Sequence, residues 1–182
     1  LRRFFVLRKD LAKANKLHLE FYEKQKKEAH KDAFNFWQDQ AQKYLSWKTP
    51  WQKVYSFKNK KHHWFEGGKL NASYNCLDRH LETKAQKNAL LWEAEDGQKK
   101  ALSYKKLHQE VSEFAKVLKN LGVEEGDIVS IYLPMIPELA VAMLACARIG
   151  ACHNVIFAGF SAEALEKRNQ LASAKALIGA DY

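Results

Sequence analysis

Cysteine, proline and long apolar runs are all scarce in this chain. Its 182 residues include three cysteines and three prolines. An odd number of thiols, without a secretory signal, argues against a disulfide framework and fits a reducing compartment, so we expect a cytoplasmic protein. The most apolar stretch, residues 139–149, is interrupted by Arg148. Because a membrane-spanning helix needs roughly 20 apolar residues, a transmembrane protein is excluded.

Signatures of phosphate loops, dinucleotide folds and serine hydrolases are absent as well. The chain has no GxxxxGK[ST], GxGxxG or GxSxG string. Cys76 and His80 have helical i,i+4 spacing, but two ligands do not make a zinc site. Neighbouring Cys152 and His153 would point to opposite faces of a strand and would not meet. We therefore expect no catalytic residue and no metal site from spacing alone. His62-His63 is interpreted as an exposed polar pair. Asp78-Arg79-His80 is interpreted as forming local salt bridges and caps.

Negative charge is scarce in the first third of the chain. The net charge is +9, and residues 1–69 hold 17 Lys+Arg against 7 Asp+Glu. Such a surface could meet nucleic acid, an anionic membrane or a phosphorylated ligand. Lysine dominates it, which favours a solvated face, so neither nucleic acid nor a membrane is expected as a partner. The basic, apolar residues 1–9 could be the remnant of a transit peptide, but Asp10 and the lack of serine argue against that origin.

The first part of the chain predicts a mainly helical, basic arm over residues 1–66. Residues 11–29 and 31–44 are typical of helices, and the second carries apolar side chains at helical spacing: Phe34, Trp37, Ala41 and Tyr44. Pro50 disfavours helix in the residue before it, so residues 47–51 are expected to form an extended, aromatic strap.

Residues 67–182 predict an incomplete α/β domain. Asp96-Gly97 indicates a hairpin between strands at 89–93 and 100–103. Ser103 is a good N-cap for a helix that Gly122 ends. Beyond it, strands alternate with helices, which implies a parallel sheet with right-handed crossovers. The expected strands are residues 128–133, 152–157 and 176–180, and the helices are residues 137–150 and 162–172.

The turn from Phe157 to Ser161 joins a strand to a helix. Ligands of open α/β sheets collect at the carboxyl ends of strands, where helix N-termini favour anions. Gly159 permits a close backbone approach and Ser161 can cap the helix. These two residues alone favour a tight loop with a capping serine over a ligand site. Residues 133–138 follow the neighbouring strand to the same edge, and they are interpreted as a rigid loop and helix start.

Five long strings of residues in this chain resemble the sequences of one known family. They are Trp47-Lys48-Thr49-Pro50-Trp51, Trp64-Phe65-Glu66-Gly67-Gly68-Lys69-Leu70-Asn71, Tyr74-Asn75-Cys76-Leu77-Asp78-Arg79-His80, Tyr132-Leu133-Pro134-Met135-Ile136-Pro137-Glu138 and Val155-Ile156-Phe157-Ala158-Gly159-Phe160-Ser161. The matching strings appear in order and at the expected separations, and the resemblance covers nearly the whole chain after about residue 14. The family that they resemble is the acetyl-CoA synthetases of the acyl-adenylating superfamily.

The resemblance implies the N-terminal portion of a two-step AMP-forming ligase. Acetate and Mg-ATP would give acetyl-adenylate, from which CoA would displace AMP. The family's catalytic motifs would lie beyond Tyr182, so the resemblance implies that these 182 residues are inactive alone. It also implies that Phe157, Ala158 and Gly159 line the CoA nucleotide site, with Ala158 standing where the family usually has glycine. The alternatives are a propionyl-CoA synthetase portion and a truncated regulatory or binding module.

Overall fold

The computed structural model describes residues 19–180 of the chain. It divides into two compact units, Leu1–Lys69 and Leu70–Tyr182. The predicted domains, residues 1–66 and 67–182, stay a prediction. The basic residues 1–9 and the start of the helix expected at residues 11–29 lie outside the described residues.

The first unit begins with the two predicted helices. They are α2 (Leu19–Lys31) and α3 (Ala33–Tyr44). Asp32 separates them and caps α3, because its carboxylate accepts a hydrogen bond of 3.1 Å from the amide of Asn35. Of the expected apolar face of α3, only Ala41 is buried, whereas the aromatic side chains of Phe34, Trp37 and Tyr44 stay about half exposed.

An antiparallel hairpin of β1 (Lys53–Lys58) and β2 (Lys61–Glu66) completes this unit, and the sequence analysis missed it. Its two-residue turn is Asn59-Lys60, and both residues have positive φ. Such turns usually carry Asn-Gly or Asp-Gly. Because lysine stands here in place of glycine, the sequence lacked the dipeptide that indicates a hairpin. The alternation of Tyr55 and Phe57 was the remaining indication of a strand.

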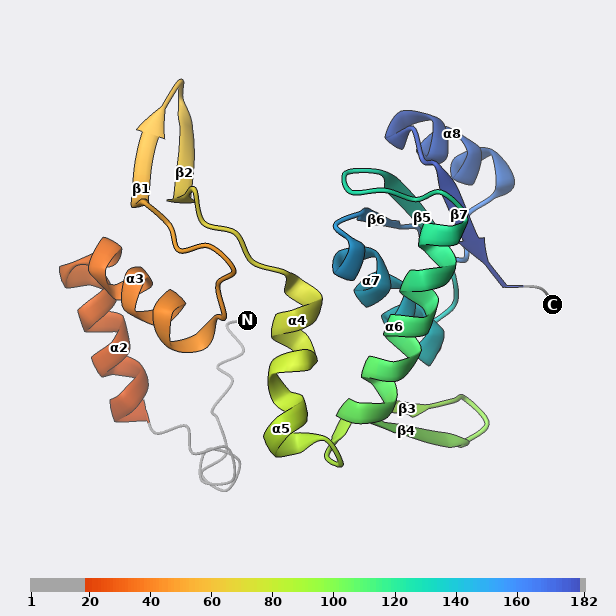
Figure 1. Cartoon of the computed structure of the whole chain (residues 1–182), viewed down its shortest axis with the longest axis horizontal. Coiled ribbons are helices and arrows are strands. Elements are labelled where there is room, and N and C mark those ends of the chain that lie inside the picture. Colours follow the sequence, from red (N-terminus) through yellow and green to blue (C-terminus); the bar gives the residue numbers. More distant parts are fainter. Residues whose placement is uncertain (1–18, 181–182) are drawn as a thin grey trace, which may run out of the picture. The chain divides into compact units, whose positions relative to one another are not determined.

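The second unit opens with short helices and a second hairpin (Figure 1). Ser103 accepts a hydrogen bond from the amide of Lys106, and Gly122 has a φ of +83°, so the predicted cap and helix end are confirmed. The hairpin predicted around Asp96-Gly97 is confirmed too. In order, the elements are α4 (Ala72–Cys76), the 3-10 helix η1 (Asp78–His80), α5 (Leu81–Lys84), β3 (Asn88–Glu93), β4 (Lys99–Ser103) and α6 (Tyr104–Asn120).

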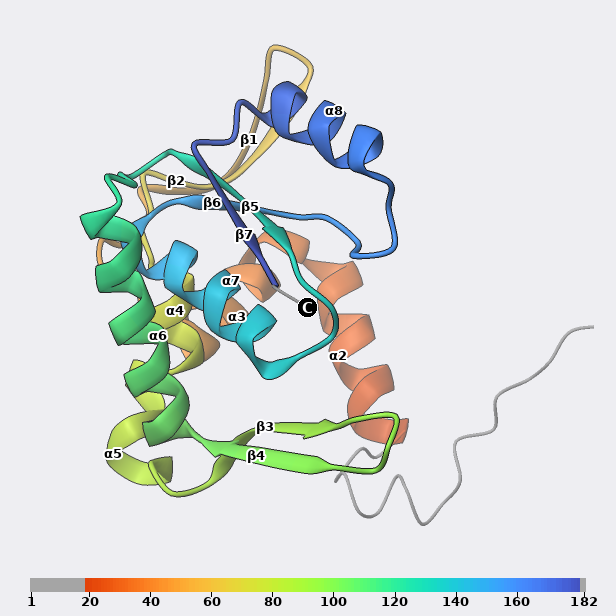
Figure 2. The ribbon, with the colours of Figure 1, turned by 90° about the vertical axis from the view of Figure 1, so that its right-hand side faces the viewer.

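A three-stranded parallel sheet follows, in the order β6-β5-β7, which confirms the α/β class. Figure 2 shows α6 and α7 on one side of this sheet and α8 on the other. That is the arrangement expected when the chain passes from the central strand to one neighbour and then back across it with right-handed crossovers. The elements are β5 (Ile128–Tyr132), α7 (Pro137–Ile149), β6 (Cys152–Val155), α8 (Ala162–Ala172) and β7 (Ala176–Gly179).

An aliphatic core lies between β5, α6 and α7. Val111 and Leu118 of α6 pack with Val129 of β5 and Cys146 of α7, all at most 1 % exposed. Burial raises the pKa of the Cys146 thiol to about 11, so this cysteine behaves as a small apolar side chain. On the other side of the sheet, α8 buries none of its residues. No helix in residues 19–180 is both long and apolar enough to span a bilayer.

Candidate functional site at the carboxyl ends of β5 and β6

The carboxyl ends of β5 and β6 lie side by side, and the chain leaves them in opposite directions. Ile131 of β5 pairs with Val155 of β6, and the amide of Ile156 donates to the carbonyl of Ile131 at 2.9 Å. From β5 the chain continues to α7 on one face of the sheet, and from β6 to α8 on the other (Figure 2). This is the switch point at which open α/β sheets bind ligands.

The turn after β6 is closed by its own backbone and by the cap of α8. The amide of Phe160 donates to the carbonyl of Phe157 at 3.1 Å. The hydroxyl of Ser161 accepts from the amide of Ala164 at 3.3 Å, which confirms its capping role. A hydrogen bond with Ser161 also lowers the pKa of Glu163. Ser161 therefore caps α8 and also interacts with the carboxylate of Glu163 in its first turn.

Ala158 fits this turn without backbone strain. Its φ is not among the positive values that would require glycine. The side chain is half-buried, and the carbonyl of Ala158 accepts a hydrogen bond from Tyr132 of β5. Gly159 is the tighter position, because a Cβ there would lie 2.6 Å from the Phe157 ring.

Aromatic rings and one arginine surround the turn. The side chain of Phe157 is 68 % exposed, and its ring meets that of Phe160 edge to face at 5.8 Å. The guanidinium of Arg168, on α8, lies 4.3 Å from the Phe160 ring centroid, within cation–π range. The turn thus presents an open aromatic face beside a positive charge.

Tyr132 is the residue of this site that the sequence analysis did not single out. It is the last residue of β5, and its hydroxyl donates to the carbonyls of Ala158 at 2.6 Å and Phe160 at 2.8 Å. A tyrosine at the end of a largely apolar strand was the available signal, because a half-buried hydroxyl needs a partner.

Side chains from β3 and β4 contact the loop after β5 and the start of α7. The indole nitrogen of Trp92 donates to the carbonyl of Met135 at 2.7 Å, and Lys100 pairs with Glu138 at 3.1 Å. Burial alone would raise the pKa of Glu138, but its own amide and Lys100 lower it.

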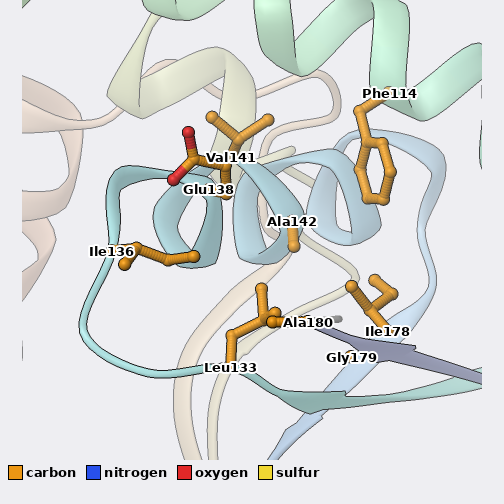
Figure 3. Close-up of a pocket in the computed structure, with 9 residues that line it drawn as sticks. All are labelled: Phe114, Leu133, Ile136, Glu138, Val141, Ala142, Ile178, Gly179 and Ala180. Carbon is orange, nitrogen blue, oxygen red and sulfur yellow. The ribbon is translucent and has the colours of Figure 1, made fainter. Parts of the chain in front are cut away.

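The loop after β5 also borders an apolar pocket. Figure 3 shows this pocket, about 280 Å³ in volume, between α7 and β7. Its lining is apolar apart from Glu138 and consists of Phe114, Leu133, Ile136, Val141, Ala142, Ile178, Gly179 and Ala180.

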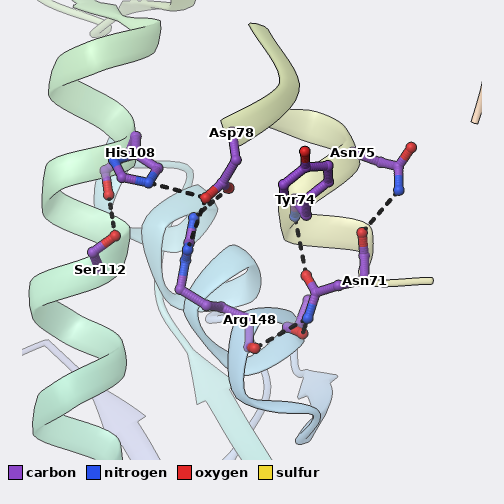
Figure 4. Close-up of polar contacts among 8 residues, drawn as sticks. Asn71, Tyr74, Asn75, Asp78, His108, Ser112 and Arg148 are labelled. Carbon is purple, nitrogen blue, oxygen red and sulfur yellow. Dashed lines mark hydrogen bonds and ion pairs between the residues drawn. The ribbon is translucent and has the colours of Figure 1, made fainter. Parts of the chain in front are cut away.

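Asp78 makes long-range contacts rather than the local ones that the sequence analysis expected. Its carboxylate receives both terminal nitrogens of Arg148, at 3.1 and 2.6 Å, and pairs with His108 at 3.1 Å (Figure 4). Burial alone would raise the pKa of Asp78, but Arg148 and then His108 lower it. The local expectation failed because the partners lie on α6 and α7, which only the folded chain brings together. The cluster fastens η1 to the two helices.

The remaining polar pairs do not assemble a site. Helix α4 ends at Cys76, and His80 lies in the separate η1. His62 and His63 are exposed on β2, where His62 is within 2.8 Å of the Tyr55 hydroxyl. Within residues 19–180, no group of three or more His, Cys, Asp or Glu residues is placed to hold a metal ion.

Two family profiles match the chain one after the other. Residues 22–76 match the acetyl-coenzyme A synthetase N-terminus, and residues 77–181 match the AMP-binding enzyme profile. The chain is 49 % identical over 175 residues to an acetyl-coenzyme A synthetase of Alcanivorax borkumensis, covering 94 % of this chain and 27 % of that protein. It is 54 % identical over 149 residues to one of Saccharophagus degradans, covering 80 % and 23 %. The chain therefore spans about a quarter of the length of these curated relatives.

A solved structure supports the same assignment. The acetoacetyl-CoA synthetase from Streptomyces lividans superposes with a TM-score of 0.77 at 29 % identity, covering 82 % of this chain and 23 % of that one. The α/β fold and the resemblance to acetyl-CoA synthetases are both confirmed. The chain belongs to the AMP-binding enzyme family, in the branch that carries the acetyl-coenzyme A synthetase N-terminal region.

Proposed function

We propose that this chain forms the N-terminal part of an AMP-forming acetate–CoA ligase. The observation that carries the proposal is that the two family regions, at 22–76 and 77–181, follow one another without a gap. A relative named acetyl-coenzyme A synthetase aligns with 94 % of this chain and therefore across both regions. In the first step, the acetate carboxylate attacks the α-phosphorus of ATP and the bond to pyrophosphate breaks. In the second, the CoA sulfur attacks the acetyl carbonyl, AMP leaves, and the thiol proton passes to solvent or base.

The turn Phe157-Ala158-Gly159 is proposed to receive the nucleotide end of CoA. Three features support this assignment. The turn lies at the switch point of the sheet, it begins a helix whose amides favour phosphate, and the exposed ring of Phe157 offers a stacking surface for adenine. Arg168 adds positive charge beside it. No catalytic residue is assigned among residues 19–180.

Mg²⁺ is proposed to accompany the ATP phosphates, where it would neutralise the charge that develops on the leaving pyrophosphate. No residue of the described part of the chain is assigned as its ligand, since none belongs to a metal-binding group. A cytoplasmic location is also proposed. It is supported by three free cysteines, of which Cys146 is buried.

The test is acetate-dependent exchange between ATP and labelled pyrophosphate, catalysed by the product of the complete reading frame that contains these residues. We expect exchange with acetate to be well above exchange with propionate. Faster exchange with propionate would favour the propionyl-CoA alternative. A reading frame that ends near Tyr182 and gives no exchange would contradict the ligase and leave a regulatory or binding module.

The proposed CoA turn is tested separately with Phe157→Ala. Loss of a stacking ring is expected to raise the KM for CoA roughly tenfold, because base–aromatic stacking contributes about 1–3 kcal/mol. Exchange needs no CoA and should stay within about twofold of the unchanged protein. A matched control is Phe57→Ala, whose ring is 57 % exposed on β1 and lies outside the proposed turn.

A further inference from the structure

Tyr132 contacts the proposed CoA turn at two points with one hydroxyl group. The oxygen lies 2.6 Å from the carbonyl oxygen of Ala158 and 2.8 Å from that of Phe160. A phenolic hydroxyl has one proton to donate, so the two carbonyls share it. Both carbonyls are thereby directed toward the end of β5, the central strand of the sheet, where the neighbouring Ile131 is fully buried.

This contact fixes the direction of two amide groups that face away from Tyr132. The described chain has no cis peptide bonds, and in a trans peptide the N–H points opposite to the C=O of the same plane. When the carbonyls of Ala158 and Phe160 point to Tyr132, the amides of Gly159 and Ser161 point away from it. No hydrogen bond within residues 19–180 uses either amide. Both therefore remain available as donors at the start of α8.

Arg168, on α8, contacts the same turn through the ring of Phe160. Its guanidinium covers the Phe160 ring at 4.3 Å and is within 3.5 Å of the carbonyl of Ala164 on its own helix. The ring of Phe160 is thus held to α8 while its carbonyl is held to β5. Because α8 buries none of its side chains, these two contacts of Phe160 help to hold the turn against the sheet.

We propose that Tyr132 is a positioning residue that presents the Gly159 and Ser161 amides to a phosphate of CoA, with Arg168 as a second support of the turn. The inference rests on the proposed function, because it assigns the role to the CoA step of that reaction. Tyr132 acts through the backbone of the turn and takes no part in bond making.

The experiment compares Tyr132→Phe with the unchanged product of the complete reading frame. Phenylalanine keeps the ring and removes only the donor. We expect the KM for CoA to rise about two- to tenfold, the factor that corresponds to loss of one ordinary hydrogen bond. The kcat and the CoA-independent pyrophosphate exchange should stay within about twofold. Tyr74→Phe is the matched control, since Tyr74 lies on α4 and is 48 % exposed.

A purely structural role would lower exchange and kcat together with CoA affinity, and that result would overturn the proposal, as would an unchanged KM for CoA. Arg168→Lys is the second variant, for use if Tyr132→Phe does not fold. This exposed position keeps its charge, while the planar guanidinium that lies over Phe160 and near the Ala164 carbonyl is lost. We expect a rise of about twofold in the KM for CoA from this variant, and no rise would count against the support from α8. Absence of exchange in the unchanged protein would contradict the proposed function itself, which separates the two failures.

Discussion

The two compact units stabilise themselves with different kinds of side chain. The second unit has an aliphatic core, in which Leu118 and Ile131 are at most 1 % exposed. Among its described residues, the first unit buries only Ala41 and Ser56. It relies instead on aromatic rings in contact, such as Trp47 against Trp51 at 4.8 Å and Phe34 against Tyr55 at 4.6 Å.

This difference predicts how each unit responds to substitution. An aliphatic core loses transfer free energy and gains a cavity when one side chain is shortened. Half-exposed rings contribute less each, about 0.5–1.5 kcal/mol for a favourable pair beyond their buried area. Single changes should therefore cost most in the second unit, and the first unit should be most sensitive where a ring has no room to move.

The largest effect is expected from Leu118→Ala in α6. This side chain is 1 % exposed, and its truncation should lower the free energy of unfolding by about 2–5 kcal/mol. Urea unfolding followed by circular dichroism measures the cost. Leu121→Ala is the control, because Leu121 is 70 % exposed and its loss should cost less than about 0.5 kcal/mol. Equal costs at both positions would contradict the account of the core.

Gly68→Ala should give the next largest effect, in the first unit. A Cβ at Gly68 would lie 2.7 Å from the Trp47 ring and 3.0 Å from the Phe65 carbonyl oxygen. Overpacking of this kind costs about 1–3 kcal/mol, since the ring must shift away from its neighbours. Thermal unfolding monitored by tryptophan fluorescence would show it. Gly179→Ala has no atom within 4 Å of its new Cβ and should be nearly neutral, so similar shifts in both variants would refute the steric explanation.

Asp78→Asn should destabilise the second unit by about 1–2 kcal/mol, a value reduced by partial solvent screening of the cluster. Arg148 would lose its ion pair while keeping a side chain that is only 23 % exposed. The lowered pKa of Asp78 means that its contribution is present above its unfolded value of about 3.8 and is lost as the pH falls through the folded pKa. The difference between the two proteins, measured by urea unfolding, should shrink from pH 7 toward pH 3. A constant difference would show that the charge is not its source.

The smallest effect, of opposite sign, is expected from Lys60→Gly. Lys60 has a φ of +61°, a conformation that costs an L-residue free energy and that glycine adopts freely. The variant should gain up to about 1 kcal/mol in thermal unfolding experiments. Lys61→Gly serves as the comparison, because Lys61 lies in β2 and glycine weakens a strand. A loss of stability in both variants would contradict the assigned turn.

The same contrast explains how much could be predicted from the sequence. In the second unit, apolar side chains recur at helical spacing along α6, and caps such as Ser103 and Gly150 mark where helices begin and end. These local signals gave the order of strands and helices there. In the first unit, β1 and β2 carry lysine, histidine and aromatic residues without a glycine turn, so neither composition nor turn chemistry indicated a hairpin.

The site was predictable only to the level of a turn. A strand followed by Gly159 and a capping Ser161 located it, because both signals are local. The role of Tyr132 depends on the registration of β5 beside β6, which brings its hydroxyl to residues 26 and 28 positions later. Asp78 and Arg148 likewise meet across 70 residues. Contacts of this kind follow from packing, and a short window of sequence does not identify the partner residues.

The central claim, that these residues belong to the N-terminal part of an acetate–CoA ligase, is tested most directly by measuring AMP release by the product of the complete reading frame. The account predicts that AMP forms in step with acetyl-CoA and that sustained release requires acetate, ATP and CoA together. Release that is independent of acetate, or no release with all three present, would contradict it.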